Sequence, residues 1–179
     1  TGSGRGIGAA TAKMLARDGA QVMVNDRDRQ ACEETAKSIR ASGGDAQAID
    51  LDLTADGSGE ALISHTIEAF GGLDIIVNNA GYVWNSAMHN HSDEQWQAML
   101  DMHATVPFRI LRAYYPWLKQ QVAAEAADGM VRCRKIVNIS SVSGTEGAPT
   151  QIAYSAGKAA VVGMTKTLAK EWGRLNVTV

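Results

Sequence analysis

Tyr154 and Lys158 are the two residues whose types and spacing point most directly to chemistry. They lie four positions apart in "YSAGK", within a stretch of helical periodicity, so their side chains would share one helix face with Cβ atoms about 5 to 6 Å apart. A free tyrosine is a poor base at neutral pH, but a neighbouring ammonium group favours the phenolate. The spacing therefore predicts a pair of side chains that transfers a proton.

Ser141 is the third residue of this kind, 13 positions before Tyr154 and at the carboxyl end of an expected strand. Open parallel sheets bind their ligands at that edge, so the Ser141 hydroxyl is expected in the same crevice, where it can hold a carbonyl oxygen. Each of the three residues also has an ordinary alternative. Ser141 could be a turn residue, Tyr154 a packed aromatic and Lys158 a solvated charge.

The chain opens with "TGSGRGIG", a glycine-rich turn ahead of an expected helix. Gly2, Gly6 and Gly8 would permit a tight turn and a close backbone approach, after which the helix N-terminus can offer free N–H groups to a pyrophosphate. An ordinary flexible turn is the alternative, because a glycine pattern alone is a weak signal. The turn is therefore a candidate dinucleotide site that depends on its context.

Asp26 supplies part of that context. It ends the next expected strand, 18 residues past Gly8, close to the spacing of about 20 residues at which a carboxylate meets the adenosine ribose in dinucleotide-binding folds. Such a carboxylate would repel a 2′-phosphate and so favours NAD. Arg27 and Arg5 argue mildly for NADP, because a guanidinium can pair with that phosphate. The balance of charges predicts NAD as the favoured cofactor.

Strands and helices are expected to alternate along the chain. Short apolar runs predict strands over 21–25, 46–52, 74–79 and 135–140, and longer periodic stretches predict helices over 6–18, 28–42, 58–70 and 92 to about 126. The first three helices are each followed by a glycine, and Ser92 with Gln95 forms a candidate capping box for the fourth. This alternation predicts an α/β fold, a Rossmann-type doubly wound parallel sheet with helices on both faces, in one domain over 1–179.

Composition excludes several classes of protein. The 179 residues are 45% hydrophobic and 20% charged with a net charge of −2, which is typical of a soluble domain and offers no basic stripe for nucleic acid. Cys32 and Cys133 lie far apart without further ligands nearby, so neither a disulfide framework nor a metal site is expected. No apolar run reaches the length of a membrane span. A cytoplasmic enzyme is the expectation.

Four motifs occur in an order that carries a family resemblance: "TGSGRGIG", "NNAG" at 78–81, Ser141 and "YSAGK". Together they make the chain resemble the short-chain dehydrogenase/reductase family along its whole length. The resemblance implies that Tyr154 is the general acid/base, that Ser141 positions the substrate oxygen, and that Lys158 binds the nicotinamide ribose and activates the tyrosine. It also implies these cofactor-binding residues: Gly2, Ser3, Arg5, Gly6, Ile7, Gly8, Asp26, Arg27, Asp52, Leu53, Asn79, Ala80, Gly81, Tyr154 and Lys158.

His103 departs from the family pattern. Where the family usually has an asparagine in a stretch like N-x-x-G-x-F, this chain reads "MHATVPF". In the family, the main-chain carbonyl of that asparagine holds a water in a proton relay leading to the lysine. Pro107 has no N–H to occupy the carbonyl of residue 103, so His103 is expected to keep the relay through its backbone, with an imidazole that titrates near neutral pH. The alternative is a polar side chain at a proline kink without a chemical role.

The stretch from "KIVNISS" to "TLAKEWGRLNVTV" most resembles the 3-oxoacyl-thioester reductase branch of the family. That branch generally uses NADPH and acts on acyl groups carried by acyl carrier protein or coenzyme A. An NAD-dependent alcohol or hydroxysteroid-type dehydrogenase is the alternative enzyme, and a dinucleotide-binding regulatory protein without catalysis is the alternative from another class. The resemblance also implies a homodimer or homotetramer, joined through the fourth helix and the helix of Tyr154.

The family comparison further implies a longer protein. In the strand order 3-2-1-4-5-6, the first strand is central and would precede Thr1, while "RLNVTV" has the pattern of an entry to a sixth strand. Without a central strand, the edges of its neighbours would be unpaired. The 179-residue piece by itself is therefore expected to be poorly stable and inactive.

Overall fold

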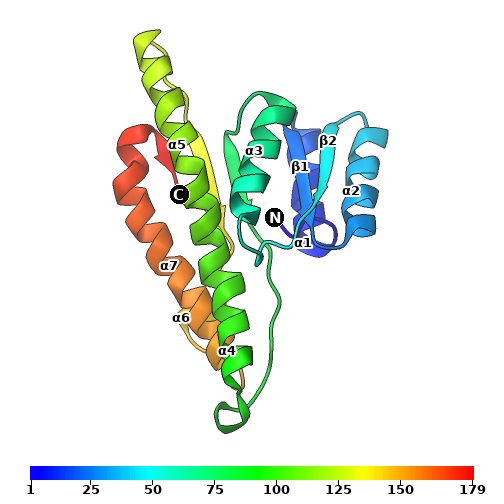
Figure 1. The fold of residues 1–179 in the computed structure, drawn as a ribbon, viewed down its shortest axis with the longest axis vertical. Helices are drawn as coiled ribbons and strands as arrows, with labels where there is room; N and C mark the ends of the chain where they lie inside the picture. Colours follow the sequence, from blue (N-terminus) through cyan, green and yellow to red (C-terminus); the bar gives the residue numbers. More distant parts are fainter. The chain divides into compact units, whose positions relative to one another are not determined.

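A computed structural model describes residues 1–179 as alternating helices and strands (Figure 1). The chain divides into two compact units. The N-terminal unit comprises Thr1–Leu73 and Asn78–Gly81, and the C-terminal unit comprises Asp74–Val77 and Tyr82–Val179. The sequence analysis expected one domain over residues 1–179, and this expectation stays a prediction. None of the helices combines the length and the apolar character needed to cross a bilayer.

The N-terminal unit is built on two parallel strands. Strand β1 (Gln21–Asp26) pairs along its whole length with β2 (Asp45–Asp50). The helices of this unit are α1 (Gly6–Arg17), α2 (Arg29–Ala41) and α3 (Ser58–Phe70). Helices α1 and α2 contact β1, and small buried side chains fill the space between these elements: Ala12, Ala16, Val24, Cys32, Ala36, Ile39 and Ala46. Alanines at these positions let the helices approach the strands closely.

Local signals placed the ends of these elements. Gly19, Gly43 and Gly71 follow α1, α2 and α3 with positive φ, as predicted for residues that end helices. Strand β2 ends at Asp50 rather than at the predicted residue 52. The Asp52 carboxylate accepts hydrogen bonds from the N–H and the hydroxyl of Thr54, and this turn ends the strand.

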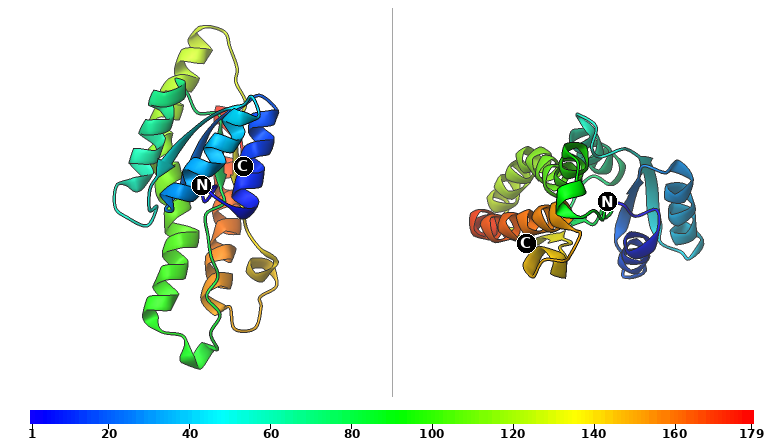
Figure 2. Two further views of the ribbon diagram at one scale, coloured as in Figure 1. Left: turned by 90° about the vertical axis from the view of Figure 1, so that its right-hand side faces the viewer. Right: turned by 90° about the horizontal axis from the view of Figure 1, so that it is seen from below.

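The C-terminal unit contains a three-stranded sheet with the order β3-β4-β5. Its strands are β3 (Ile75–Asn78), β4 (Arg134–Asn138) and β5 (Val177–Thr178), and β4 and β5 are parallel. Its helices are α4 (Asp93–Leu100), α5 (Val106–Ala127), α6 (Val142–Thr145) and α7 (Ile152–Trp172). Helices α5 and α7 lie side by side (Figures 1 and 2), and the ring of Trp172 stacks on Tyr115.

The predicted single helix over 92 to about 126 is interrupted. It begins at Asp93 with the predicted capping box of Ser92 and Gln95, but a π-helical turn over Asp101–Thr105 separates α4 from α5. Pro107 lacks an N–H and its ring would clash with the carbonyl of residue 103 in a regular α-helix. The wider turn avoids this clash, and the Val106 N–H bonds to the Asp101 carbonyl instead.

The strand neighbours agree with the predicted fold class. The neighbours β1-β2 in one unit and the order β3-β4-β5 in the other each match consecutive strands of the order 3-2-1-4-5-6. Strands alternate with helices throughout, and the strands are short and buried in part, as in other open parallel sheets. The α/β, Rossmann-type assignment is therefore confirmed.

Candidate active site

The glycine-rich turn of the N-terminal unit has no space for side chains at two positions. A Cβ on Gly8 would overlap the carbonyl oxygen of Gly2 and lie 2.6 Å from Nδ2 of Asn79. Gly2 has φ +57°, and a Cβ there would lie 2.7 Å from Cα of Ala80. Glycine is therefore required at both positions, because the backbone of the turn folds back on itself and on the "NNAG" segment.

Hydrogen bonds join this turn to the "NNAG" segment. The Thr1 hydroxyl accepts the N–H groups of Asn79 and Ala80, both at 3.0 Å, and the Asn79 amide donates to the carbonyls of Thr1 and Gly2. Ser3 exchanges hydrogen bonds with the backbone of Asn25 at the end of β1. The structure thus brings together Gly2, Ser3, Asn79 and Ala80, which the sequence predicted as cofactor residues. Thr1 was missed, because its role depends on a segment 78 residues away.

Helix α1 begins at Gly6, within this glycine-rich segment, and no side chain caps its N-terminus. Gly6 and Ile7 are exposed there, with 72% of Ile7 accessible. Uncapped N–H groups at a helix N-terminus, preceded by a close-packed glycine turn, suit the pyrophosphate of a dinucleotide. The glycine-rich turn and the N-terminus of α1 therefore fit the dinucleotide that the "TGSGRGIG" motif implied.

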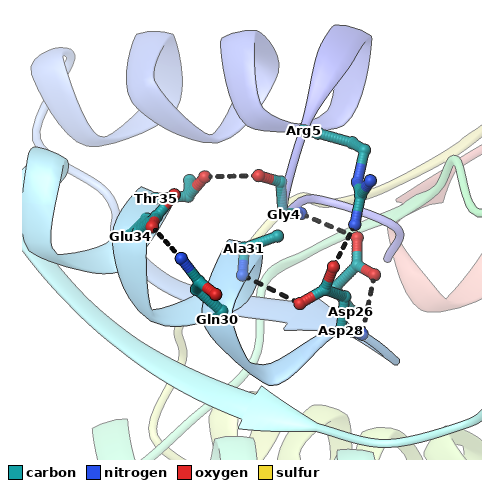
Figure 3. Close-up of polar contacts among 8 residues, drawn as sticks. All are labelled: Gly4, Arg5, Asp26, Asp28, Gln30, Ala31, Glu34 and Thr35. Atoms are coloured by element: carbon teal, nitrogen blue, oxygen red, sulfur yellow. Dashed lines mark hydrogen bonds and ion pairs between the residues drawn. The ribbon is translucent and has the colours of Figure 1, made fainter.

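Asp26 lies at the end of β1 beside the turn (Figure 3). One of its carboxylate oxygens accepts the Gly4 N–H at 3.0 Å and the other accepts the Asp28 N–H at 3.1 Å. The Arg5 guanidinium forms an ion pair with Asp28 (Figure 3). The hydrogen bond from the Ala31 N–H is the largest cause that lowers the pKa of the Asp28 carboxyl, and the contact with Arg5 lowers it further. Arg5 is thus directed to Asp28, and Asp26 keeps lone pairs for further donors.

The other predicted adenine-side residues lie in the same unit. Arg27 is exposed and Leu53 is buried. The Thr54 hydroxyl and N–H lower the pKa of the Asp52 carboxyl, and Arg27 adds a smaller effect of the same sign. Gly81 is exposed at the end of the "NNAG" segment. Arg27 directly follows β1, and Asp52 and Leu53 follow β2, at the carboxyl ends where open sheets bind ligands.

Tyr154 and Lys158 lie in α7 of the C-terminal unit, as their spacing predicted. The Lys158 Nζ lies 5.8 Å from the centroid of the Tyr154 ring and donates to the carbonyl of Ile139 at 2.6 Å. Lys158 is 5% exposed, and this burial lowers its pKa. Tyr154 is half-buried. A phenol that solvent can reach therefore stands beside an ammonium group that solvent barely reaches.

Ser141 is the N-cap residue directly before the short helix α6. Its backbone is extended and its Oγ accepts the N–H of Ser143 at 3.1 Å. No hydrogen bond within the protein takes its hydroxyl hydrogen, and the residue is partly exposed. The hydroxyl is thus oriented by one backbone donor and keeps its own hydrogen for a carbonyl oxygen.

His103 corrects one expectation from the sequence. Its side chain is 2% exposed, its Nε2 lies 2.7 Å from the carbonyl oxygen of Tyr82, and its ring stands edge-on to Tyr154. Burial lowers the pKa of His103 to about 4, although the Tyr82 carbonyl raises it in part. The expectation of an imidazole that titrates near neutral pH is therefore wrong. The ring is neutral at pH 7, and Nε2 is the nitrogen that donates to Tyr82.

The backbone of His103 lies in the π-helical turn, at a close approach to α7. A Cβ on Gly157 would lie only 2.8 Å from Cβ of His103, so glycine is needed for this approach. Turns of this kind are frequent at functional sites. The role of the His103 carbonyl in a water relay stays a prediction.

Comparison with known proteins gives a consistent assignment. A model of the short chain dehydrogenase family matches residues 1–179. The chain is 37% identical over 180 residues to a 3-oxoacyl-[acyl-carrier-protein] reductase of Synechocystis sp., and the match covers all of this chain and 69% of that protein.

Solved structures are similar as well. A short chain dehydrogenase from Mycobacterium avium superposes with a TM-score of 0.92 at 34% identity, over 100% of this chain and 63% of that one. A metagenomic short-chain oxidoreductase in complex with NADP gives a TM-score of 0.86 at 31% identity, over 98% of this chain and 75% of that one. With the glycine turn, "NNAG", Ser141, Tyr154 and Lys158 at the places described above, this chain belongs to the short-chain dehydrogenase family and is a short-chain oxidoreductase.

Proposed function

We propose that this chain carries the cofactor site and the catalytic residues of an NAD(P)-dependent enzyme that interconverts a secondary alcohol and a ketone. The observation that carries the proposal is the cluster of Tyr154, Lys158 and His103, which puts a phenol beside a buried ammonium group. Membership of the short-chain dehydrogenase family supports the same reaction class.

Tyr154 is the general acid/base in this proposal. Its hydroxyl donates a proton to the ketone oxygen during reduction and becomes a phenolate, and that phenolate takes a proton from the alcohol during oxidation. The Ser141 hydroxyl donates a hydrogen bond to the same oxygen, since its hydrogen is not used within the protein. Lys158 places its ammonium group 5.8 Å from the centroid of the Tyr154 ring, and the carbonyl of His103 holds a water that relays the proton toward Lys158.

A nicotinamide dinucleotide, when bound, supplies or accepts the hydride. The residues that would hold it are the glycine turn, the N-terminus of α1, the "NNAG" segment and Asp26. We favour NAD over NADP, because Asp26 would repel a 2′-phosphate and Arg5 is engaged with Asp28. Against this, a similar structure was solved in complex with NADP.

The substrate that we favour is a 3-oxoacyl thioester, which the enzyme would reduce to the 3-hydroxyacyl form. The 37% identity to a 3-oxoacyl-[acyl-carrier-protein] reductase supports this choice. Asp26 favours the second candidate, an NAD-dependent alcohol or hydroxysteroid-type dehydrogenase. Its negative charge would repel the 2′-phosphate of NADP and so favours NAD, the cofactor of that dehydrogenase. A dinucleotide-binding regulatory protein is the least supported reading, since Ser141, Tyr154 and Lys158 are all present.

We also propose that the protein forms a homodimer or homotetramer through α5 and α7. These helices border a groove of about 810 Å³ with an apolar lining that includes Phe108, Leu111, Tyr115, Leu168 and Trp172. Phe108 is 50% exposed in the single chain, and a second copy would cover it. Sedimentation of the intact protein and of a Phe108→Glu variant tests this contact. The proposed oligomer acts on a small molecule in the cytoplasm, without nucleic acid or membrane.

The function is tested by cofactor titration and turnover on the intact protein that contains this chain. NADH and NADPH are titrated first, and reduction of acetoacetyl-coenzyme A and oxidation of short secondary alcohols are then measured. Tight NADPH binding with fast thioester reduction supports the reductase. NADH binding with turnover of alcohols alone supports the dehydrogenase. Cofactor binding that does not lead to turnover with either class would overturn both enzyme assignments.

A further inference from the structure

The segment after β4 is joined to the start of α7 through Ser143. The Ser143 N–H donates to Oγ of Ser141 at 3.1 Å, and the Ser143 hydroxyl donates to Oε1 of Gln151 at 2.8 Å. Ser143 is 8% exposed. One buried residue therefore contacts the proposed substrate-orienting hydroxyl with its backbone and the entry of the Tyr154 helix with its side chain.

Gln151 is well placed to pass on the position of Tyr154. It directly precedes α7, whose first residue is Ile152, and lies three residues before Tyr154. Its carbonyl accepts the Ser155 N–H at 2.7 Å, in the first turn of that helix. The bond between the Ser143 and Gln151 side chains therefore links the residue that contacts Ser141 to the start of the helix that carries Tyr154.

Helix α6 cannot hold Ser141 by itself. It has four residues, too few for a stable isolated helix, so its contacts with α7 decide its orientation. At Gly144 the two helices approach so closely that a Cβ would lie 2.6 Å from the carbonyl carbon of Lys158. The Ser140 hydroxyl donates to the carbonyl oxygen of Lys158 at 3.0 Å. These contacts fix one side of α6, and the bond from Ser143 to Gln151 fixes the other.

The turn before Gln151 is strained. Thr150 has φ +66°, which is unusual for a β-branched residue, and its carbonyl accepts the Ser86 N–H at 2.8 Å. Strain of this size persists only where surrounding contacts hold the backbone, and it concentrates at functional sites. The strained turn sets the direction in which Gln151 leaves the loop, toward Ser143.

We propose that Ser143 and Gln151 are positioning residues for the reaction, and that the hydrogen bond between them sets the distance from the Ser141 hydroxyl to Tyr154. The inference rests on the proposed function, because both hydroxyls must meet one substrate oxygen. Ser141 uses a lone pair for the Ser143 N–H, so the orientation of Ser143 decides where the Ser141 hydrogen points. Breaking the bond would lower the rate and leave cofactor binding unchanged, since neither residue belongs to the glycine turn or the Asp26 region.

The test is a double-mutant cycle on the intact protein with Ser143→Ala and Gln151→Met. Each single variant is expected to lower kcat for acetoacetyl-coenzyme A reduction about tenfold, because small misplacements of reacting groups are costly. The Kd for NADH and NADPH stays unchanged. The double variant falls no further than either single one, since both remove the same bond. Gln151→Glu keeps an acceptor for the Ser143 hydroxyl and recovers most of the rate.

Two further variants separate the possible outcomes. Thr145→Ala removes another hydroxyl of α6, one that bonds only to the Val142 carbonyl, and is expected to keep the full rate. Tyr154→Phe tests the function itself. If Tyr154→Phe is inactive while Ser143→Ala and Gln151→Met keep kcat, or act additively, the positioning role is overturned and the function stands. If Tyr154→Phe keeps the full rate, the proposed function fails and the positioning role fails with it.

Discussion

The imidazole of His103 stands edge-on to the ring of Tyr154, with the ring centroids 5.0 Å apart and the planes at 90°. The same imidazole bonds to the carbonyl of Tyr82 at 2.7 Å. His103, in the π-helical turn, thus packs against the proposed acid/base Tyr154. It also holds Tyr82, the first residue after "NNAG", by a hydrogen bond. Since the ring is buried and neutral at pH 7, it acts through packing and one hydrogen bond.

Replacing Tyr154 by Phe is expected to abolish most turnover. The change removes the hydroxyl that exchanges the proton, and general acid/base groups typically contribute about 10² to 10⁴ in rate. The Kd for the cofactor should stay within a factor of about two, because the ring and its packing against His103 remain. Steady-state kinetics and a fluorescence titration with NADH measure the two effects.

Tyr115→Phe is the matched control for that change. Tyr115 lies in α5 and stacks on Trp172, with ring centroids 5.6 Å apart. Its hydroxyl has no part in the proposed chemistry, so turnover should be unchanged. Equal loss of activity in Tyr115→Phe and Tyr154→Phe would contradict the acid/base assignment.

The stability of the protein is expected to fall in mild acid because of His103. Its pKa is about 4 when folded and about 6.5 when unfolded, so between these values the unfolded state binds a proton that the folded state does not. Stability is therefore fully present above about pH 6.5 and declines toward pH 4, by about 2 kcal/mol between pH 7 and pH 5. Urea unfolding at several pH values measures this slope.

His103→Gln removes the titrating group and should flatten that part of the stability curve. The pH profile of kcat should have no step that depends on the imidazole, because the imidazole stays neutral throughout the neutral range. A wild-type step near pH 6.5 that disappears in His103→Gln would show that the folded imidazole titrates there, against its observed burial.

Gly8→Ala is expected to weaken the dinucleotide site. The added Cβ would overlap the Gly2 carbonyl, so the turn must open and its alignment with α1 is lost. We expect at least a tenfold rise in the Kd for the cofactor and, as for other overpacked sites, a loss of about 1 to 3 kcal/mol in stability. Gly163→Ala is the control, because no atom lies within 4 Å of the added Cβ in α7. It should raise stability by about 0.5 to 1 kcal/mol.

Asp26→Asn should move cofactor preference toward NADPH. The substitution removes the charge that would repel a 2′-phosphate but keeps an oxygen that can accept the Gly4 N–H. The ratio of the Kd values for NADH and NADPH should rise about tenfold, which corresponds to about 1.4 kcal/mol. Asp28→Asn releases Arg5 from its ion pair and should shift the ratio in the same direction. A ratio that is unchanged in Asp26→Asn would exclude this carboxylate from the adenosine site.

Much of the fold could be predicted from the sequence, because the signals involved are local. The capping box of Ser92 and Gln95 and the glycines that end α1 to α3 act within a few residues. The apolar runs placed β1, β2, β3 and β4 to within two residues at each end. The four-residue spacing of Tyr154 and Lys158 needed only a helix to bring them to one face.

Features that depend on contacts between segments far apart in the chain could be seen only in the tertiary structure. The π-helical turn, the hydroxyl of Thr1 beneath "NNAG" and the bond from Ser143 to Gln151 have no periodicity or cap that reveals them. His103 shows the difference most clearly. Its type and position could be read directly, but its protonation state is a property of the surrounding side chains, and close packing against Tyr154 and Gly157 excludes the water that would keep an imidazolium charged.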